Sequence, residues 1–215
     1  MNIVLVPALK IHPRTVLASY ERTYYRHLPT FKREEWLRSR IALKLAYCRQ
    51  TKKKLALSTL SVKKNPRGIP YISGSNLFCS ISHSGGLGAA VVAPFPVGID
   101  IERVRARSPR LLSYISAPAE QRLLPSSASR RLTTMWAVKE AVLKAMGTGL
   151  QVPMKELYVK KRIKNSYEIL TKRGKQWVVN VKYRGPFCIA LATPNHERTI
   201  LYWAKSSDLQ TAASV

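Results

Sequence analysis

Four residues could together perform metal-assisted chemistry on a phosphate: Asp100, Glu102, Glu140 and Lys144. A hard divalent cation such as Mg²⁺ binds a small number of carboxylates and completes its shell with water and with phosphate oxygens of a substrate. The three acids would supply these carboxylates. Lys144 follows Glu140 by about one helical turn, so its ammonium could reach a phosphate that the same cation holds. The residue types therefore predict Mg²⁺-dependent work on a phosphorylated substrate.

The surrounding patterns predict the elements that must position these side chains. Residues 97–102 alternate between apolar and other side chains, which is typical of a buried strand and puts Asp100 and Glu102 on one face. A helix is predicted to end at Gly147, a plausible C-cap. Trp136, Glu140 and Lys144 share one face of that helix, because they are four residues apart. A strand and a helix would have to pack together to complete the site.

Three separated blocks of sequence resemble the signature of the 4'-phosphopantetheinyl transferases. The first is Gly98-Ile-Asp100-Ile-Glu102, and the second runs from Trp136 through Lys139-Glu140-Ala and Lys144 to Gly147-Thr-Gly-Leu150. The third, Ile81-Ser-His-Ser-Gly85, lies upstream. Their order and spacing are more specific than any single block. The resemblance is greatest to the larger surfactin-synthetase type and covers roughly residues 33–150.

The resemblance implies an activity, a fold and a set of partners. Phosphopantetheine would be transferred from coenzyme A to a serine of an acyl or peptidyl carrier protein, with Mg²⁺ as cofactor. The fold implied is α+β, with two similar α/β subdomains (a pseudo-dimer) and the active site between them. Asp100, Glu102 and Glu140 would bind the metal, and Glu140 and Lys144 would be catalytic. Lys144 would also contact coenzyme A.

Coenzyme A contacts are predicted in the first half of the chain as well. Ser82 and His83 lie in a glycine-rich turn between two predicted strands, a place that offers backbone N–H groups and hydroxyls to an anion. Arg40 and Lys44 lie on a predicted helix over residues 33–50, which in the family lies near the bound coenzyme A. Without the other blocks, His83 would be interpreted as a surface or core histidine that binds no ligand. The helix would be interpreted as an ordinary amphipathic helix with a basic outer face.

At two positions, the sequence allows more than one interpretation of how it compares with the family. The family usually has a basic residue between a glycine and a proline, but here Gly68 and Pro70 enclose Ile69. Arg67 or Lys64 could replace that contact. Glu120 follows a predicted helix start, where it would either lie near the metal through water or complement the helix dipole.

Charge is the unusual feature of the composition. The 215 residues include 37 Lys and Arg against 11 Asp and Glu, a net charge of +26. An acidic partner, a phosphorylated ligand or non-specific affinity for nucleic acid would each explain this excess, and charge alone does not separate them. We expect an acidic carrier protein, with only non-specific binding of nucleic acid.

The same composition predicts where the protein works. No apolar run is long enough for a transmembrane helix, and the first residues lack the features of a signal peptide. The three cysteines lie far apart, which argues against a disulfide framework or zinc site and favours a reducing compartment. We expect a cytoplasmic monomer that does not bind membranes.

The chain divides into two predicted subdomains and a tail. Residues 1–96 would form the N-terminal subdomain with the coenzyme A contacts, residues 97–204 the C-terminal subdomain with the metal and catalytic motifs, and residues 205–215 a loose tail. Strands are predicted at 2–6, 55–63, 77–82 and 87–93 in the first half. The second half shows five, at 157–163, 167–172, 176–183, 187–193 and 199–204.

Two other functions fit part of the sequence. A metal-dependent nuclease would also use Asp-x-Glu with a distal Glu and Lys, but it leaves the Ser82-His83-Ser84 block unexplained. A non-catalytic nucleic-acid-binding module would explain the charge. It would not explain the acidic face of Asp100 and Glu102, because a phosphate-binding surface should avoid carboxylates.

Overall fold

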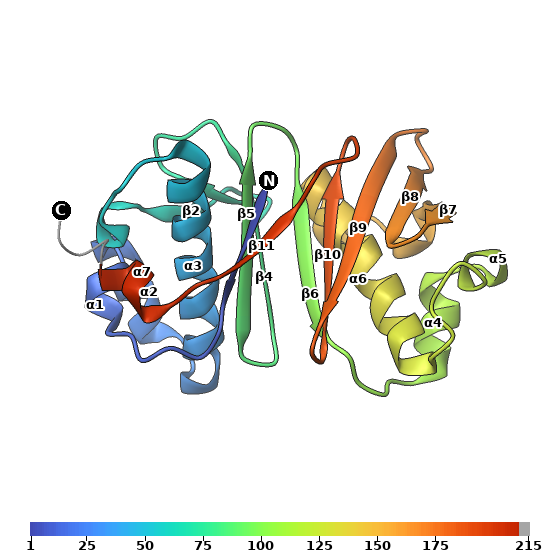
Figure 1. Cartoon of the computed structure of the whole chain (residues 1–215), viewed down its shortest axis with the longest axis horizontal. Helices are drawn as coiled ribbons and strands as arrows, with labels where there is room; N and C mark the ends of the chain where they lie inside the picture. Colours follow the sequence, from blue (N-terminus) through green and yellow to red (C-terminus); the bar gives the residue numbers. More distant parts are fainter. Residues whose placement is uncertain (211–215) are drawn as a thin grey trace. The chain divides into compact units, whose positions relative to one another are not determined.

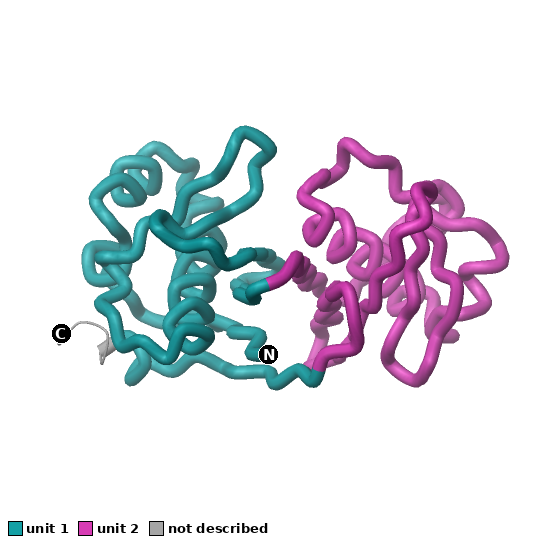
Figure 2. The backbone as a smooth tube through the Cα atoms, turned by 90° about the horizontal axis from the view of Figure 1, so that it is seen from above, with its two compact units in different colours: residues 1–94, 198–215 teal, residues 95–197 magenta. Residues whose placement is uncertain are grey.

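The computed structural model describes residues 1–210 and divides into two compact units. Unit 1 comprises residues 1–94 together with the segment that starts at Arg198, and unit 2 comprises residues 95–197 (Figure 2). Each unit contains helices and its own sheet, so the predicted α+β class is confirmed. Among the described helices, none is long and apolar enough to cross a membrane.

Unit 1 packs one long helix against a four-stranded sheet (Figure 1). The sheet has the order β11-β1-β5-β4, and α3 contacts β1, β5 and β4. Residues 87–93 of β5 are all buried, as expected for a central strand. The bounds are β1 Asn2–Val6, α1 Pro13–Val16, α2 Ser19–His27, α3 Thr30–Thr51, a 3₁₀ helix Leu57–Thr59, β2 Val62–Lys64, β3 Pro70–Ile72, β4 Phe78–Ser84, β5 Leu87–Ala93, β11 Ile200–Trp203 and α7 Ser206–Gln210.

Unit 2 repeats this plan with a second long helix and a five-stranded antiparallel sheet. The strand order is β6-β10-β9-β8-β7, and α6 contacts β6, β10 and β9. The bounds are β6 Gly98–Arg103, α4 Pro109–Ile115, α5 Pro118–Gln121, α6 Ala128–Met146, two 3₁₀ helices Gly149–Gln151 and Met154–Glu156, β7 Leu157–Ile163, β8 Ser166–Thr171, β9 Gln176–Arg184 and β10 Phe187–Thr193.

The structure departs from the predicted elements in three places. Residues 55–63 form no long strand, because the 3₁₀ helix interrupts them and only β2 pairs, with β3. Residues 198–204, expected in the C-terminal subdomain, belong to unit 1, because β11 pairs in parallel with β1. Part of the expected loose tail forms the short helix α7, and the rest, residues 211–215, lies outside the described residues.

A buried lysine ties α3 to the preceding helices of unit 1. The Lys44 side chain is fully buried, and its ammonium donates to the Val16 carbonyl at 2.7 Å and to the Glu21 carboxylate. Glu21 also accepts a hydrogen bond from the backbone N–H of Ala18 at 2.9 Å, which caps α2. The Glu21 carboxylate thus neutralises the buried Lys44 ammonium and also accepts a hydrogen bond from a backbone N–H at the start of α2.

Unit 2 contains the same arrangement around Lys139. Its fully buried ammonium donates to the Ile115 carbonyl at 2.7 Å and to Glu120 at 2.9 Å. Glu120 caps α5 by accepting from the Ala117 N–H at 2.6 Å and also accepts from the Val159 N–H at 2.9 Å. The carboxylate of Glu120 is therefore engaged inside the unit, and of the two expectations for this residue the capping role is the one we retain.

The two units are therefore related by a structural repeat that the sequence does not reveal. In each, the long helix carries a lysine that reaches a carbonyl and a glutamate five residues further along the chain. Each long helix also ends in a left-handed residue, Lys52 (φ 56°) after α3 and Gly147 (φ 69°) after α6. The repeat aligns Lys44 with Lys139, and hence the following residues of α3 with those of α6.

Breaking this buried pair should destabilise the fold. We expect Lys139→Met to cost about 3–5 kcal/mol of unfolding free energy, because it leaves the Glu120 charge in the interior without its partner. Urea unfolding measures the effect. The double variant Lys139→Met/Glu120→Gln should recover part of the loss, whereas Lys161→Met, on an exposed side chain, should change little. Equal stabilities of all variants would contradict the assigned role.

Candidate active site

The close packing of β6 against α6 depends on Gly98. A Cβ at this position would collide with the backbone carbonyl oxygen of Ala141 and would lie 2.5 Å from the Ala145 nitrogen. Because glycine has no side chain, the strand and the helix can approach until their backbones touch. This close approach brings the residues that follow Gly98 on β6 next to the last two turns of α6.

Two ion pairs of the predicted site residues lie along this contact. Lys144 Nζ lies 2.7 Å from Asp100 Oδ1, and Asp100 is 4% exposed. Two residues further along β6, Glu102 Oε2 accepts from the guanidinium of Arg107 at 2.7 Å. Asp100 and Glu102 both pair with β10, opposite Ala190 and Cys188, as their shared face requires. The strand and the helix thus bring Asp100 to Lys144, whereas Glu102 pairs with Arg107.

Glu140 lies half-buried near the same charges. Burial raises the pKa of its carboxyl above the usual value of 4.5, the Lys144 ammonium opposes this, and the negative charges of Asp100 and Glu102 raise the pKa further. The two strand acids therefore lie close enough to act on Glu140 electrostatically. A bound cation would relieve the repulsion among these carboxylates and favour the ionised form of Glu140.

The donor types suit a hard cation, since carboxylate oxygens are the ligands that Mg²⁺ prefers. Across residues 1–210, however, no group of three or more His, Cys, Asp or Glu is assembled so that it could hold a metal ion. Asp100 and Glu102 instead face the cationic groups of Lys144 and Arg107. The chemistry of the three acids fits a divalent cation, and two of them, Asp100 and Glu102, form ion pairs with cationic side chains.

Residues 96–192, which contain all of these side chains, match the model of the "4'-phosphopantetheinyl transferase superfamily". Over this segment, the chain is similar to the 4'-phosphopantetheinyl transferase superfamily. The resemblance of the two sequence blocks that lie within the segment is thereby confirmed.

Two curated phosphopantetheinyl transferases are similar to this chain. The "4'-phosphopantetheinyl transferase gsp" of Aneurinibacillus migulanus is 26% identical over 123 residues, which is 55% of this chain and 51% of that protein. The "4'-phosphopantetheinyl transferase" of Bacillus subtilis is 30% identical over 98 residues, 43% of this chain and 44% of that protein. The chain therefore spans about half the length of the curated relatives it matches.

In unit 1, the two predicted basic residues of α3 lie in different environments. Lys44 is committed to the interior pair with Glu21. Arg40 is also 4% exposed, but its guanidinium lies over the Trp36 ring at 4.6 Å and 4.0 Å from Glu21. Among the described residues, its Nε and one terminal nitrogen have no hydrogen-bond partner. Arg40 therefore keeps donors for an anion.

The turn with Ser82 and His83 is held by α3. His83 is half-exposed and its Nδ1 lies 3.0 Å from Glu35, whose other oxygen accepts from the Gly86 N–H at 3.1 Å. Arg38 donates to the Gly86 carbonyl at 2.6 Å, and Ser82 is buried. Sequence reasoning missed Glu35 and Arg38, although their spacing of three residues put them on one helix face.

Two further residues bear on the proposed ligand contacts. In the turn around Ile69, Asn65 accepts from the backbone N–H groups of Arg67 and Ile69, both at 3.0 Å. The pKa of Lys64 is lowered by partial burial and then by the charge of Arg40, so these two cations lie near one another. Lys64 and Arg67 both stay predictions for the basic contact that the family has where Ile69 lies here. In unit 2, sequence reasoning missed Arg107, and the basic run after β6 was its only signal.

Proposed function

We propose that this protein transfers the 4'-phosphopantetheine group of coenzyme A to a serine of an acyl or peptidyl carrier protein, with Mg²⁺ as cofactor. The observation that carries the proposal is the Asp100–Lys144 contact beside Glu140, inside the segment that matches the superfamily. In the proposed reaction the serine oxygen forms a bond to the phosphorus next to pantetheine, and the bond from that phosphorus to the nucleotide phosphate breaks.

The residues of unit 2 have distinct roles in this proposal. Asp100, Glu102 and Glu140 would hold Mg²⁺, which when bound neutralises charge on the pyrophosphate. Glu140 accepts the serine proton, directly or through water. Lys144 is half-buried, where its ammonium stabilises the charge that builds on the phosphate oxygens more strongly than it would in water.

The coenzyme A nucleotide is proposed to contact residues of unit 1. Arg40 has buried donors, and the Glu35 carboxylate fixes the turn that presents His83 and Ser82. Lys44 is left out of the proposed contacts, because its ammonium already serves Val16 and Glu21 in the interior. Lys64 takes its place as a candidate, since it lies near Arg40.

A mass measurement tests the proposed reaction. An apo carrier protein incubated with this protein, coenzyme A and Mg²⁺ should gain the mass of one phosphopantetheine group. The gain should disappear when the modified serine of the carrier is replaced by alanine, and when Mg²⁺ is chelated. If carrier proteins of the fatty-acid, polyketide and peptide types all keep their mass, the proposed function is refuted.

The partner is proposed to be acidic, and the protein to be a cytoplasmic monomer. The net charge of +26 suits an acidic carrier surface, and Cys48, Cys79 and Cys188 are free thiols, in keeping with a reducing compartment. Nucleic acid would bind only through the same non-specific electrostatics.

Salt should separate the two substrates of this reaction. We expect the KM for carrier to rise several-fold between low and physiological salt, because exposed charges are screened beyond roughly 8–10 Å. The KM for coenzyme A should move less, since its phosphates would lie beside partly buried groups. Steady-state kinetics over a salt series measures both.

Binding of DNA is the control for this charge effect. Weak, sequence-independent binding that vanishes with salt is expected. A carrier KM that stays flat over the salt series would show that the basic surface serves another partner. Sequence-selective DNA binding at high salt would favour a nucleic-acid function instead.

A further inference from the structure

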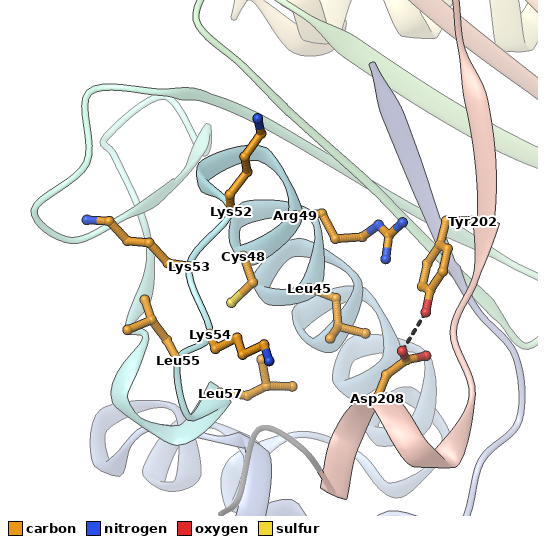
Figure 3. A pocket seen from close by; sticks show the side chains of 10 residues that line it. All are labelled: Leu45, Cys48, Arg49, Lys52, Lys53, Lys54, Leu55, Leu57, Tyr202 and Asp208. Atoms are coloured by element: carbon orange, nitrogen blue, oxygen red, sulfur yellow. Dashed lines mark hydrogen bonds between the residues drawn. The ribbon is translucent and has the colours of Figure 1, made fainter. Parts of the chain in front are cut away.

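A cavity of about 310 Å³ lies in unit 1, at the C-terminal end of α3 (Figure 3). Its walls come from α3, from the loop that follows α3, from β11 and from α7. The volume is at the lower end of the ~300–1,000 Å³ typical of small-molecule sites. None of the residues proposed to contact coenzyme A or Mg²⁺ lines this cavity.

The inner wall of the cavity is apolar. Leu45 and Leu57 are buried, and Leu55 is half-buried beside them. Burial raises the pKa of the Cys48 thiol, so this residue stays neutral and contributes another weakly polar surface. These side chains would accept a short aliphatic chain or a similar apolar body.

The outer part of the cavity is cationic. Lys52, Lys53 and Lys54 all belong to the lining, and in Figure 3 the Lys54 side chain extends toward the side where Asp208 lies. The Arg49 guanidinium lies 3.5 Å from the centre of the Tyr202 ring. Asp208, the one acidic residue of the lining, accepts from the Tyr202 hydroxyl and from the Lys205 N–H at 2.7 Å. Positive charge therefore exceeds negative charge around an apolar floor.

The structural repeat explains why this cavity suits an anion rather than a metal. Counted from the paired buried lysines Lys44 and Lys139, Arg49 occupies the position that Lys144 occupies on α6. Leu45 occupies the position of Glu140 by the same count. Unit 1 thus keeps the cation of the candidate active site but has an apolar residue where unit 2 has a carboxylate.

We propose that this cavity, named here the α3 pocket, binds a small amphipathic anion. Its apolar body packs on Leu45, Leu55 and Leu57, and its head group is a carboxylate or a phosphate monoester held between Arg49 and Lys54. Charge complementarity and the apolar floor must both contribute, so neither a free phosphate nor a neutral alcohol satisfies the site. The proposal is independent of the proposed transferase function.

Calorimetric titration of the full chain with decanoate and with decyl phosphate tests the ligand class. At least one of them should bind with one-to-one stoichiometry, and the tighter identifies the head group. Inorganic phosphate and decanol should each bind at least about tenfold more weakly, since each lacks one half of the recognised chemistry. Equal affinity for phosphate or for decanol, or no saturable binding of either anion, overturns the proposal.

Three substitutions locate the binding. Arg49→Ala and Lys54→Ala should each weaken the tighter anion about tenfold, which is the scale of one lost charged hydrogen bond. Lys161→Ala removes the same charge from an exposed side chain of unit 2 that is not part of the lining, and it should change affinity less than about twofold. Circular dichroism checks that all three remain folded. If Lys161→Ala weakens binding as much as Lys54→Ala, the interaction is general electrostatics and the α3 pocket is not the site.

Discussion

Asp100→Ala is expected to abolish phosphopantetheine transfer and greatly weaken Mg²⁺ binding, while the fold survives. Asp100 is almost fully buried, and its carboxylate contacts the Lys144 ammonium at 2.7 Å. Removing it takes away a proposed metal ligand and one contact of the lysine that should stabilise the transferred phosphoryl group.

Calorimetric titrations with Mg²⁺ and with coenzyme A measure this result without relying on activity. Asp100→Asn is the matched variant, because it keeps the shape of the side chain and removes only its charge. It should lose Mg²⁺ affinity as Asp100→Ala does, and thermal melts should show that both variants fold. Unchanged Mg²⁺ affinity together with normal turnover in either variant would refute the metal assignment.

Glu140→Gln should lower turnover by at least ~100-fold, the usual scale for losing a general base. The substitution keeps volume and hydrogen bonding but removes the charge. Burial raises the pKa of Glu140, Lys144 opposes this, and Asp100 and Glu102 raise the pKa further. The base form is therefore lost on acidification at a pH above 4.5, the usual pKa of a glutamate. A bound cation would shift this point downward.

A pH series of kcat/KM checks this assignment. The wild type should lose activity at acid pH as Glu140 is protonated, and Glu140→Gln should lack that part of the profile. Lys144→Ala should also reduce turnover, and by more than it reduces carrier affinity, because its ammonium acts on the phosphate rather than on the carrier. Wild-type rates in both variants would mean that the catalytic centre lies elsewhere.

Local sequence patterns were sufficient for much of unit 2. The strands Leu157–Ile163 and Phe187–Thr193 have the predicted bounds. The predicted turns with Gly174 and Gly185 separate β8 from β9 and β9 from β10. The end of α6 at Gly147 was also predicted, since a left-handed C-cap favours glycine. The shared face of Asp100 and Glu102 follows from the two-residue period of a strand alone. These features depend on neighbours in the chain.

Other features depend on contacts between distant residues, and only the tertiary structure decided them. Of the two residues predicted to contact coenzyme A from the helix over 33–50, Arg40 keeps donors for a ligand, whereas the Lys44 ammonium is paired with Glu21, 23 positions away. The Glu35 contact with the turn at His83 and the pairing of β11 with β1 are likewise long-range. Helix periodicity shows which face a residue occupies but not what packs on that face. A buried lysine needs a carboxylate partner to remain charged. Because that partner is distant in the sequence, only the folded structure identifies it.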